Sequence, residues 1–298
     1  VPVLVDIDPE TLCIDPARVR DAITSRTRAV IPVHLYHRMA DLDALLAICR
    51  EHDLYLIEDS AHTHGSRWRD HGAGTLGVFG SYSFQRSKLM NSGEGGALLM
   101  QDQELYLRVV SQRSCGREFQ GVKVHSGNYR ITSFQAAVLR GQLAAHRHNA
   151  PLIDRHGLAL DAAVDDAPGV RSLRRPAGIT RQCSYAFCFL YDSEAFDGLD
   201  VHRFREALGA ELGMPFHTTY TPLHHSEVYY PHTKKRHRWS PEYAKSIDPS
   251  RYELPVAEQV WSQEAVIAQW PIFNCEPGQA STLTDAIAKV YDHRRELI

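Results

Sequence analysis

The alternation of strand-like and helix-like segments in the first half of the chain constrains its fold more than any other feature. A short apolar run at residues 28–33 is followed by a helical pattern at 40–52, in which leucines recur on one face. Further strand-like runs lie at 54–57, 78–84 and 96–100. Strands that alternate with helices form a mostly parallel sheet covered by helices, so we expect an α/β fold.

The pattern changes in the second half of the chain. An amphipathic helix is predicted at 132–146, and turn-rich segments follow it before a strand at 185–191 and a helix at 201–212. We therefore predict a domain boundary near residue 150. It separates a large domain, residues 1–150, from a smaller α+β domain, residues 151–298.

The composition of the 298 residues excludes several classes of protein. The formal net charge is −3, and the basic run at residues 234–238 is too short to follow a phosphate backbone, so we expect no nucleic-acid partner. The six cysteines form no CxxC pair, which argues against a metal site and a disulfide framework and favours a reduced, cytoplasmic protein. No segment is apolar for long enough to cross a membrane.

Polar residues gather after two of the predicted strands, where parallel sheets bind their ligands. Asp59 ends one strand and begins a polar run, whereas a lone carboxylate there could equally cap a helix. Ser83 ends the next strand, Lys88 follows it, and glycines cluster at 93–96. A lone lysine in such a place is usually a surface residue, but this combination makes Lys88 a candidate for a Schiff base.

Pyridoxal phosphate (PLP) chemistry requires this set of groups. The lysine must lose its proton to form an imine with the cofactor, and partial burial helps it to do so. A buried aspartate keeps the pyridine nitrogen protonated, so that the ring can accept electrons. The phosphate needs hydroxyl and N–H donors, and Ser83 could supply one.

Four motifs carry a resemblance to a known family. The segments EDSAHTHGS, SFQRSKLMNSGEGG, SGNYRITSFQAAVLRGQL and LPVAE resemble the DegT/DnrJ/EryC1/StrS family of PLP-dependent aminotransferases. The resemblance runs from Val1 to about residue 275. It implies PLP-dependent transferase fold type I, with the large domain incomplete at its N-terminus, and a homodimer with shared active sites.

The resemblance also implies a role for each candidate residue. Lys88 forms the Schiff base with the cofactor and Asp59 faces the pyridine nitrogen. Ser83 contacts the phosphate, His62 lies near the ring and its 3-hydroxyl, and Asn128 reaches the phosphate in the partner subunit. Two alternatives to these cofactor roles remain. His62 could be a histidine of a polar turn at a helix start, and Asn128 could be a loop residue that satisfies its own turn.

The chain begins inside an apparent strand and without Met. We expect that an upstream part precedes it, because family members carry a phosphate-binding helix start and a ring-stacking aromatic residue before this strand. A truncated or non-catalytic family member is therefore one alternative, although the retained Lys88 argues against it.

The C-terminal half narrows the expected substrate. The segments at 220–225 and 229–234 resemble the branch that aminates inosose rings with glutamine. We therefore expect a keto-cyclitol or keto-sugar acceptor and a glutamine or glutamate donor, as in aminocyclitol antibiotic biosynthesis. FQRSKLMNSGEGG and SCGR also resemble 3-amino-5-hydroxybenzoate synthase, so a PLP dehydratase or lyase remains the alternative.

Overall fold

The computed structural model describes residues 1–269, 272 and 277–298, and the chain divides into two compact units. The first comprises Thr27–Arg155 and Pro176–Tyr185, and we call it the Lys88 unit. The second comprises Val1–Arg26, His156–Arg175 and Ala186–Ile298, and we call it the terminal unit.

This division differs from the single boundary predicted near residue 150. One crossing between the units lies close to that position, at Arg155 and His156. The first 26 residues, however, belong to the terminal unit, and residues 176–185 return to the Lys88 unit. These two segments are assigned by contacts between residues that are far apart in the sequence. A pattern of neighbouring residues does not reveal such contacts.

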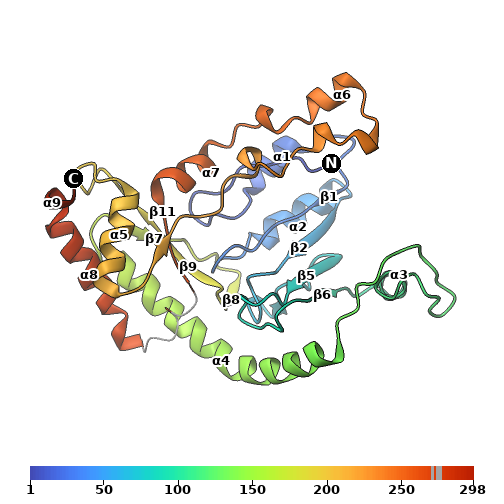
Figure 1. The fold of residues 1–298 in the computed structure, drawn as a ribbon, viewed down its shortest axis with the longest axis horizontal. Helices are drawn as coiled ribbons and strands as arrows, with labels where there is room; N and C mark the ends of the chain where they lie inside the picture. Colours follow the sequence, from blue (N-terminus) through green and yellow to red (C-terminus); the bar gives the residue numbers. More distant parts are fainter. Residues whose placement is uncertain (270–271, 273–276) are drawn as a thin grey trace. The chain divides into compact units, whose positions relative to one another are not determined.

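A four-stranded sheet forms the centre of the Lys88 unit, in the order β1-β2-β5-β6 (Figure 1). Its strands are β1 (Ala29–Val30), β2 (Tyr55–Asp59), β5 (Phe79–Ser83) and β6 (Gly96–Leu99). The first three are parallel, and β6 is antiparallel to β5. Strand β1 is shorter than the predicted run because Pro32 has no N–H to donate to the sheet. This mixed, mostly parallel sheet confirms the predicted α/β class.

Helix α2 (Leu42–Glu51) covers this sheet with an apolar face of Leu42, Leu45 and Ile48. Its start is fixed by Asp41, whose side chain accepts a hydrogen bond from the N–H of Ala44 at 3.0 Å. The unit also contains α3 (Gln103–Arg113) and a small antiparallel sheet of β4 (His71–Gly72), β3 (Arg67–Trp68) and β8 (Ile179–Arg181).

Helix α4 (Ser133–Asp165) is much longer than the helix predicted at 132–146, and the chain passes from one unit to the other within it. Pro151 lies inside the helix. A proline is expected to end or kink a helix, so the pattern around it did not predict this continuation.

The terminal unit contains a second four-stranded sheet, in the order β10-β11-β9-β7 and antiparallel throughout. Its strands are β7 (Val170–Ser172), β9 (Ala186–Tyr191), β10 (Phe216–His217) and β11 (Ala265–Gln269). Every residue of β9 is buried, as expected for a central strand in an apolar core.

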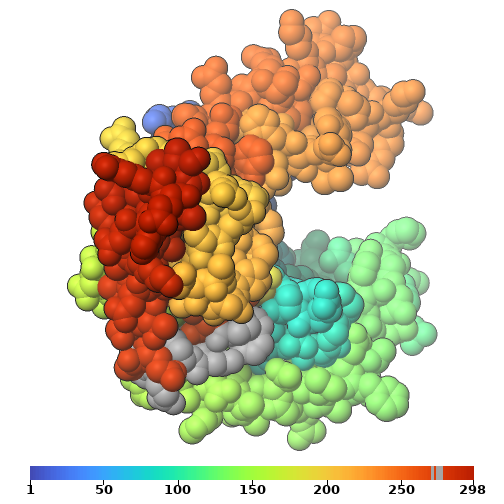
Figure 2. All heavy atoms as spheres, turned by 60° about the vertical axis from the view of Figure 1, so that its left-hand side comes forward, coloured from blue at the N-terminus to red at the C-terminus, as the bar shows by residue number. Residues whose placement is uncertain are grey.

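Helix α5 (Val201–Leu212) contacts α8 (Ser281–Asp292) in this unit, and Lys289 pairs with Glu211 across them at 2.8 Å. Figure 2 shows α8 in red beside the gold surface of α5. Among the described residues, the unit also contains the helices α1 (Pro16–Ala22), α6 (Pro241–Ser246), α7 (Pro255–Gln259) and α9 (Arg294–Leu297), and the π-helix η5 (Val260–Glu264). Short 3-10 helices are η1 (Leu223–His225), η2 (Pro231–Thr233), η3 (Lys235–His237), η4 (Pro249–Arg251) and η7 (Pro277–Gln279).

In the part of the chain that the structure describes, no helix has both the length and the apolar character needed to span a membrane.

Candidate active site

Asp59 lies at the carboxyl end of β2, between the two parallel neighbours of that strand. Its N–H donates to the carbonyl of Pro32 at 2.9 Å, and its carbonyl accepts from the N–H of His34 at 3.0 Å. The carboxylate accepts from the N–H of Ala61 at 3.1 Å and from the hydroxyl of Ser81 at 3.5 Å. These contacts fix a half-buried carboxylate at the edge of the sheet where ligands bind.

Lys88 lies in the turn between β5 and β6. Its N–H donates to the carbonyl of Gln85 at 2.9 Å, and its own carbonyl accepts from the amide of Asn91 at 3.1 Å. Burial lowers the pKa of the Lys88 amine, while the negative charge of Asp59 acts in the opposite direction. The amine is therefore easier to deprotonate than a surface lysine, as a nucleophilic lysine must be.

His62 is buried beside this lysine. Its Nδ1 accepts a hydrogen bond from the N–H of Tyr36 at 3.3 Å. Burial, together with the positive charges of Lys88 and His64, lowers the pKa of His62 to about 3. The ring is thus neutral at physiological pH, and the acceptor role of Nδ1 leaves the proton on Nε2.

Tyr185 contacts both Lys88 and His62, and its place at the start of a predicted strand did not predict this role. The Nζ atom of Lys88 lies 4.3 Å from the centre of the Tyr185 ring. The same ring stacks on His62, with centroids 4.1 Å apart. Its hydroxyl lies 3.3 Å from that of Ser87. Tyr185 reaches this group from the segment 176–185, far along the chain, so only the fold reveals the contact.

Ser83 ends β5, and its hydroxyl accepts a hydrogen bond from the N–H of Gln85 at 3.3 Å. Its carbonyl accepts from Nε2 of His64 at 2.8 Å. Burial is the main cause that lowers the pKa of His64 to about 4. His64 therefore connects Ser83 to the turn that carries His62, and it is a second residue of this group that the sequence pattern did not predict.

Asn128 is exposed, and within the described residues it makes no hydrogen bond to Lys88, Asp59, His62 or Ser83. Its side-chain oxygen accepts from the N–H of Arg130 at 3.2 Å, and its backbone pairs with Ser114. The structure of one chain thus brings together four of the five predicted site residues, whose predicted roles toward a cofactor remain hypotheses.

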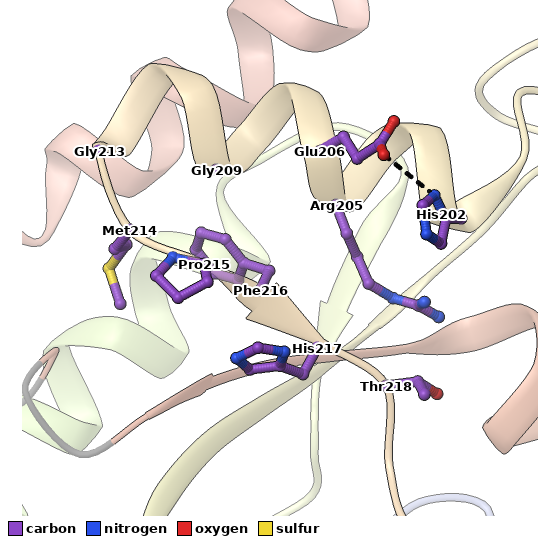
Figure 3. A pocket seen from close by; sticks show the side chains of 10 residues that line it. All are labelled: His202, Arg205, Glu206, Gly209, Gly213, Met214, Pro215, Phe216, His217 and Thr218. Atoms are coloured by element: carbon purple, nitrogen blue, oxygen red, sulfur yellow. Dashed lines mark ion pairs between the residues drawn. The ribbon is translucent and has the colours of Figure 1, made fainter.

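A pocket of about 810 Å³ lies in the terminal unit, lined by residues of α5 and β10 (Figure 3). Polar side chains of its lining contact other groups of the protein. His202 lies 3.5 Å from Glu206, and the guanidinium of Arg205 donates to the carbonyl of Ala265 at 3.0 Å. None of the predicted site residues is among those that line it. The group around Lys88 is therefore the candidate active site.

The Lys88 unit is thus an α/β unit with a carboxylate at the end of a central strand and a partly buried lysine in the following turn. Residues 1–269 match the DegT/DnrJ/EryC1/StrS aminotransferase family, and the chain belongs to that family. This confirms the resemblance that the four sequence motifs carried.

Curated relatives are similar over nearly the whole chain. A Micromonospora echinospora protein assigned as an L-glutamine:3-amino-2,3-dideoxy-scyllo-inosose aminotransferase is 41% identical, over 98% of this chain and 72% of its own length. The L-glutamine:2-deoxy-scyllo-inosose aminotransferase of Streptoalloteichus tenebrarius is 38% identical, over 100% of this chain and 73% of its own length. The L-glutamine:scyllo-inosose aminotransferase of Streptomyces griseus is 36% identical, over 100% of this chain and 73% of its own length.

Solved structures share the fold. 3-Amino-5-hydroxybenzoic acid synthase superposes with a TM-score of 0.80 at 28% identity, covering 98% of this chain and 75% of that chain. DesV from S. venezuelae, in complex with a ketimine intermediate, has the same TM-score and identity, covering 98% and 72%. The predicted fold type I architecture is therefore confirmed, and the chain is an aminotransferase-family enzyme.

Proposed function

We propose that this protein is a PLP-dependent aminotransferase that moves the amino group of L-glutamine to a keto-cyclitol. The observation that carries the proposal is the group formed by Lys88, Asp59, His62 and Tyr185 within one unit. Family membership and the curated relatives support the reaction, and the names of those relatives support the donor and the class of acceptor.

The residues around Lys88 fit the cofactor. Pyridoxal phosphate, when bound, supplies an aldehyde for the amine and a ring that accepts electrons from the substrate. The carboxylate of Asp59 has an acceptor oxygen held in place by an N–H, so it can hold a proton on a pyridine nitrogen. The neutral ring of His62 offers an Nε2–H donor without bringing a second positive charge. Ser83 would contribute its hydroxyl to the phosphate.

In this proposal, each residue around Lys88 has a separate role in amino transfer. Lys88, with a pKa below its usual value, reacts as the neutral amine and can later carry a proton to or from the substrate carbon. The carboxylate of Asp59 would hold the proton on the pyridine nitrogen. Tyr185 limits the freedom of the lysine side chain by contact with its amino group.

A borohydride experiment tests the assignment of the lysine. The protein is incubated with pyridoxal phosphate, reduced, digested and mapped by mass spectrometry. We expect the pyridoxyl group on Lys88, and its loss in Lys88→Ala but not in the matched variant Lys123→Ala. A label that stays at full yield in Lys88→Ala, on another lysine, would contradict the assignment.

A second candidate function is dehydration or lyase chemistry of the kind that 3-amino-5-hydroxybenzoic acid synthase represents. The fold does not separate the two functions, since that structure and DesV superpose equally well. Assays with and without an amino donor separate the two functions. Formation of an aminocyclitol with consumption of glutamine supports the first function, whereas loss of water from a cyclic substrate without any amino donor supports the second.

The active protein is a homodimer in this proposal. Asn128 is exposed, and large apolar side chains close to it in sequence are exposed as well, with Tyr129 at 72% and Phe134 at 87% of their full accessible surface. Apolar surface of this kind is typical of protein contacts. A partner subunit would cover it and would receive the amide of Asn128 at its own cofactor phosphate.

A further inference from the structure

Two histidines and a glutamate of the terminal unit converge on one point, and none of them belongs to the group around Lys88. His224 and His225 lie in η1, and Glu258 lies in α7. The Nε2 atoms of the two histidines are 2.6 and 3.5 Å from Oε1 of Glu258. One potential ligand atom from each residue lies within 4.8 Å of the other two.

The backbone that carries Glu258 is held in place. The two carboxylate oxygens of Asp6 accept from the N–H groups of Val256 and Ala257, both at 3.0 Å. The hydroxyl of Ser262 donates to the carbonyl of Glu258 at 2.7 Å. The carboxylate therefore extends from a fixed turn, which favours ligand binding because little further ordering is needed.

The two histidines differ in their exposure. The side chain of His224 is only 4% exposed, whereas that of His225 is 48% exposed. The centroids of their rings lie 4.0 Å apart, and the ring of Trp261 stacks on that of His225 with centroids 6.2 Å apart. The buried Nδ1 of His224 has no hydrogen-bond partner in the described residues, so Glu258 is the polar contact that orients this ring.

Both imidazoles present Nε2 to the same oxygen of Glu258, at 2.6 and 3.5 Å, so the three side chains converge on one point. Two imidazoles and one carboxylate are a donor set that zinc uses in proteins, with a fourth position left for water or another ligand. We propose that His224, His225 and Glu258 bind a divalent metal ion of the zinc class, which fastens η1 to α7. The half-exposed side chain of His225 leaves the ion open to solvent.

Metal titration of the tag-free protein tests this site directly. After dialysis against EDTA, the protein is titrated with Zn²⁺ by calorimetry, and Co²⁺ is added separately to record its visible spectrum. We expect one equivalent to bind with micromolar or tighter affinity. His225→Ala and Glu258→Gln should each weaken binding by about ten-fold or more, since changes even in the groups around metal ligands have effects of that size. His232→Ala, a histidine that pairs with Asp248 instead, should bind as the wild type does.

The same experiment can overturn the proposal. No saturable binding of one equivalent, or equal affinity in wild type, His225→Ala and Glu258→Gln, would mean that these residues make hydrogen bonds only. His225→Ala decides the matter if Glu258→Gln fails to fold, because His225 is half-exposed. Borohydride labelling of Lys88 in His225→Ala reports on the proposed aminotransferase site, so the two proposals fail separately.

Discussion

At the scale of single residues, adjacent carboxylates at the end of β2 have different environments. Glu58 is fully buried and accepts hydrogen bonds from His34 and from the N–H groups of Gly74, Leu76 and Gly77. Burial raises the pKa of Glu58, but its hydrogen bond to His34 and the backbone donors outweigh that effect, and the pKa lies below its usual value. Glu58 therefore holds the loop of residues 74–77 against β2 by hydrogen bonds. Asp59 points to the other face, as strand alternation requires, and has the capacity to bind a ligand.

Replacement of this second carboxylate tests its proposed role. In Asp59→Asn an amide cannot keep a pyridine nitrogen protonated, so we expect pyridoxal phosphate to bind while single-turnover amino transfer slows by about 10²-fold or more. Glu58→Gln is the comparison, since it should lower stability rather than change the rate per bound cofactor. Transfer at the wild-type rate in Asp59→Asn would show that a different group faces the nitrogen.

Tyr185 offers a prediction that needs no cofactor. Its aromatic face attracts the ammonium form of Lys88, and such contacts contribute roughly 0.5–1 kcal/mol or more. Tyr185→Leu keeps an apolar neighbour but removes this attraction, so the pKa of Lys88 should fall by about half a unit. The rate of acetylation of Lys88 as a function of pH, followed by mass spectrometry, measures that pKa.

Tyr185→Phe is the matched control for this measurement. It keeps the ring and loses only the hydroxyl near Ser87, so its lysine should titrate as in the wild type. An unchanged or raised pKa in Tyr185→Leu, with the fold intact by circular dichroism, would exclude an effect of the ring on the amine.

At the scale of elements, the turn at Gly74 lies against β5 and leaves no room for a side chain. A Cβ atom on Gly80 would collide with the backbone of Gly74. Gly80→Ala should therefore lower the free energy of unfolding by roughly 1–3 kcal/mol. Gly141→Ala is the contrasting variant, because this exposed helix position has nothing within 4 Å and should gain about 0.5–1 kcal/mol. Urea unfolding compares the two, and equal stability of both variants would contradict this account.

The elements also show how far the sequence alone could lead. Apolar periodicity and strand-end polar residues predicted β2, β5, β6 and α2, and with them the neighbourhood of Asp59 and Lys88, because these signals are local. The extension of α4 past Pro151 was not predicted, since tertiary packing can override a helix-breaking residue. Tyr185 was missed for a different reason: its contact with Lys88 exists only after residues 176–185 return to the Lys88 unit.

At the scale of the whole molecule, Asn128 is the predicted site residue that does not contact the group around Lys88 within the described part of one chain. Asn128 accepts a hydrogen bond from Arg130 in its own loop, and its side chain is otherwise exposed. The loop precedes α4, whose first turns expose Phe134 and Val138. In the proposed homodimer, a second copy of the chain would cover these apolar groups, and the Asn128 amide would donate to the cofactor phosphate of that copy. Such a charge-assisted contact is stronger than one between neutral groups.

Mixed dimers distinguish this arrangement from a site contained in one subunit. Asn128→Ala and Lys88→Ala are purified separately, and each should have little or no activity. If Asn128 acts on the partner's site, one site of a mixed dimer carries both changes and the other carries neither, so activity should return after mixing. Native mass spectrometry verifies that subunits have exchanged. Exchange without any recovery of activity would place Asn128 in the site of its own subunit, because each mixed dimer would then contain two defective sites. Full activity of Asn128→Ala alone would place Asn128 outside any site.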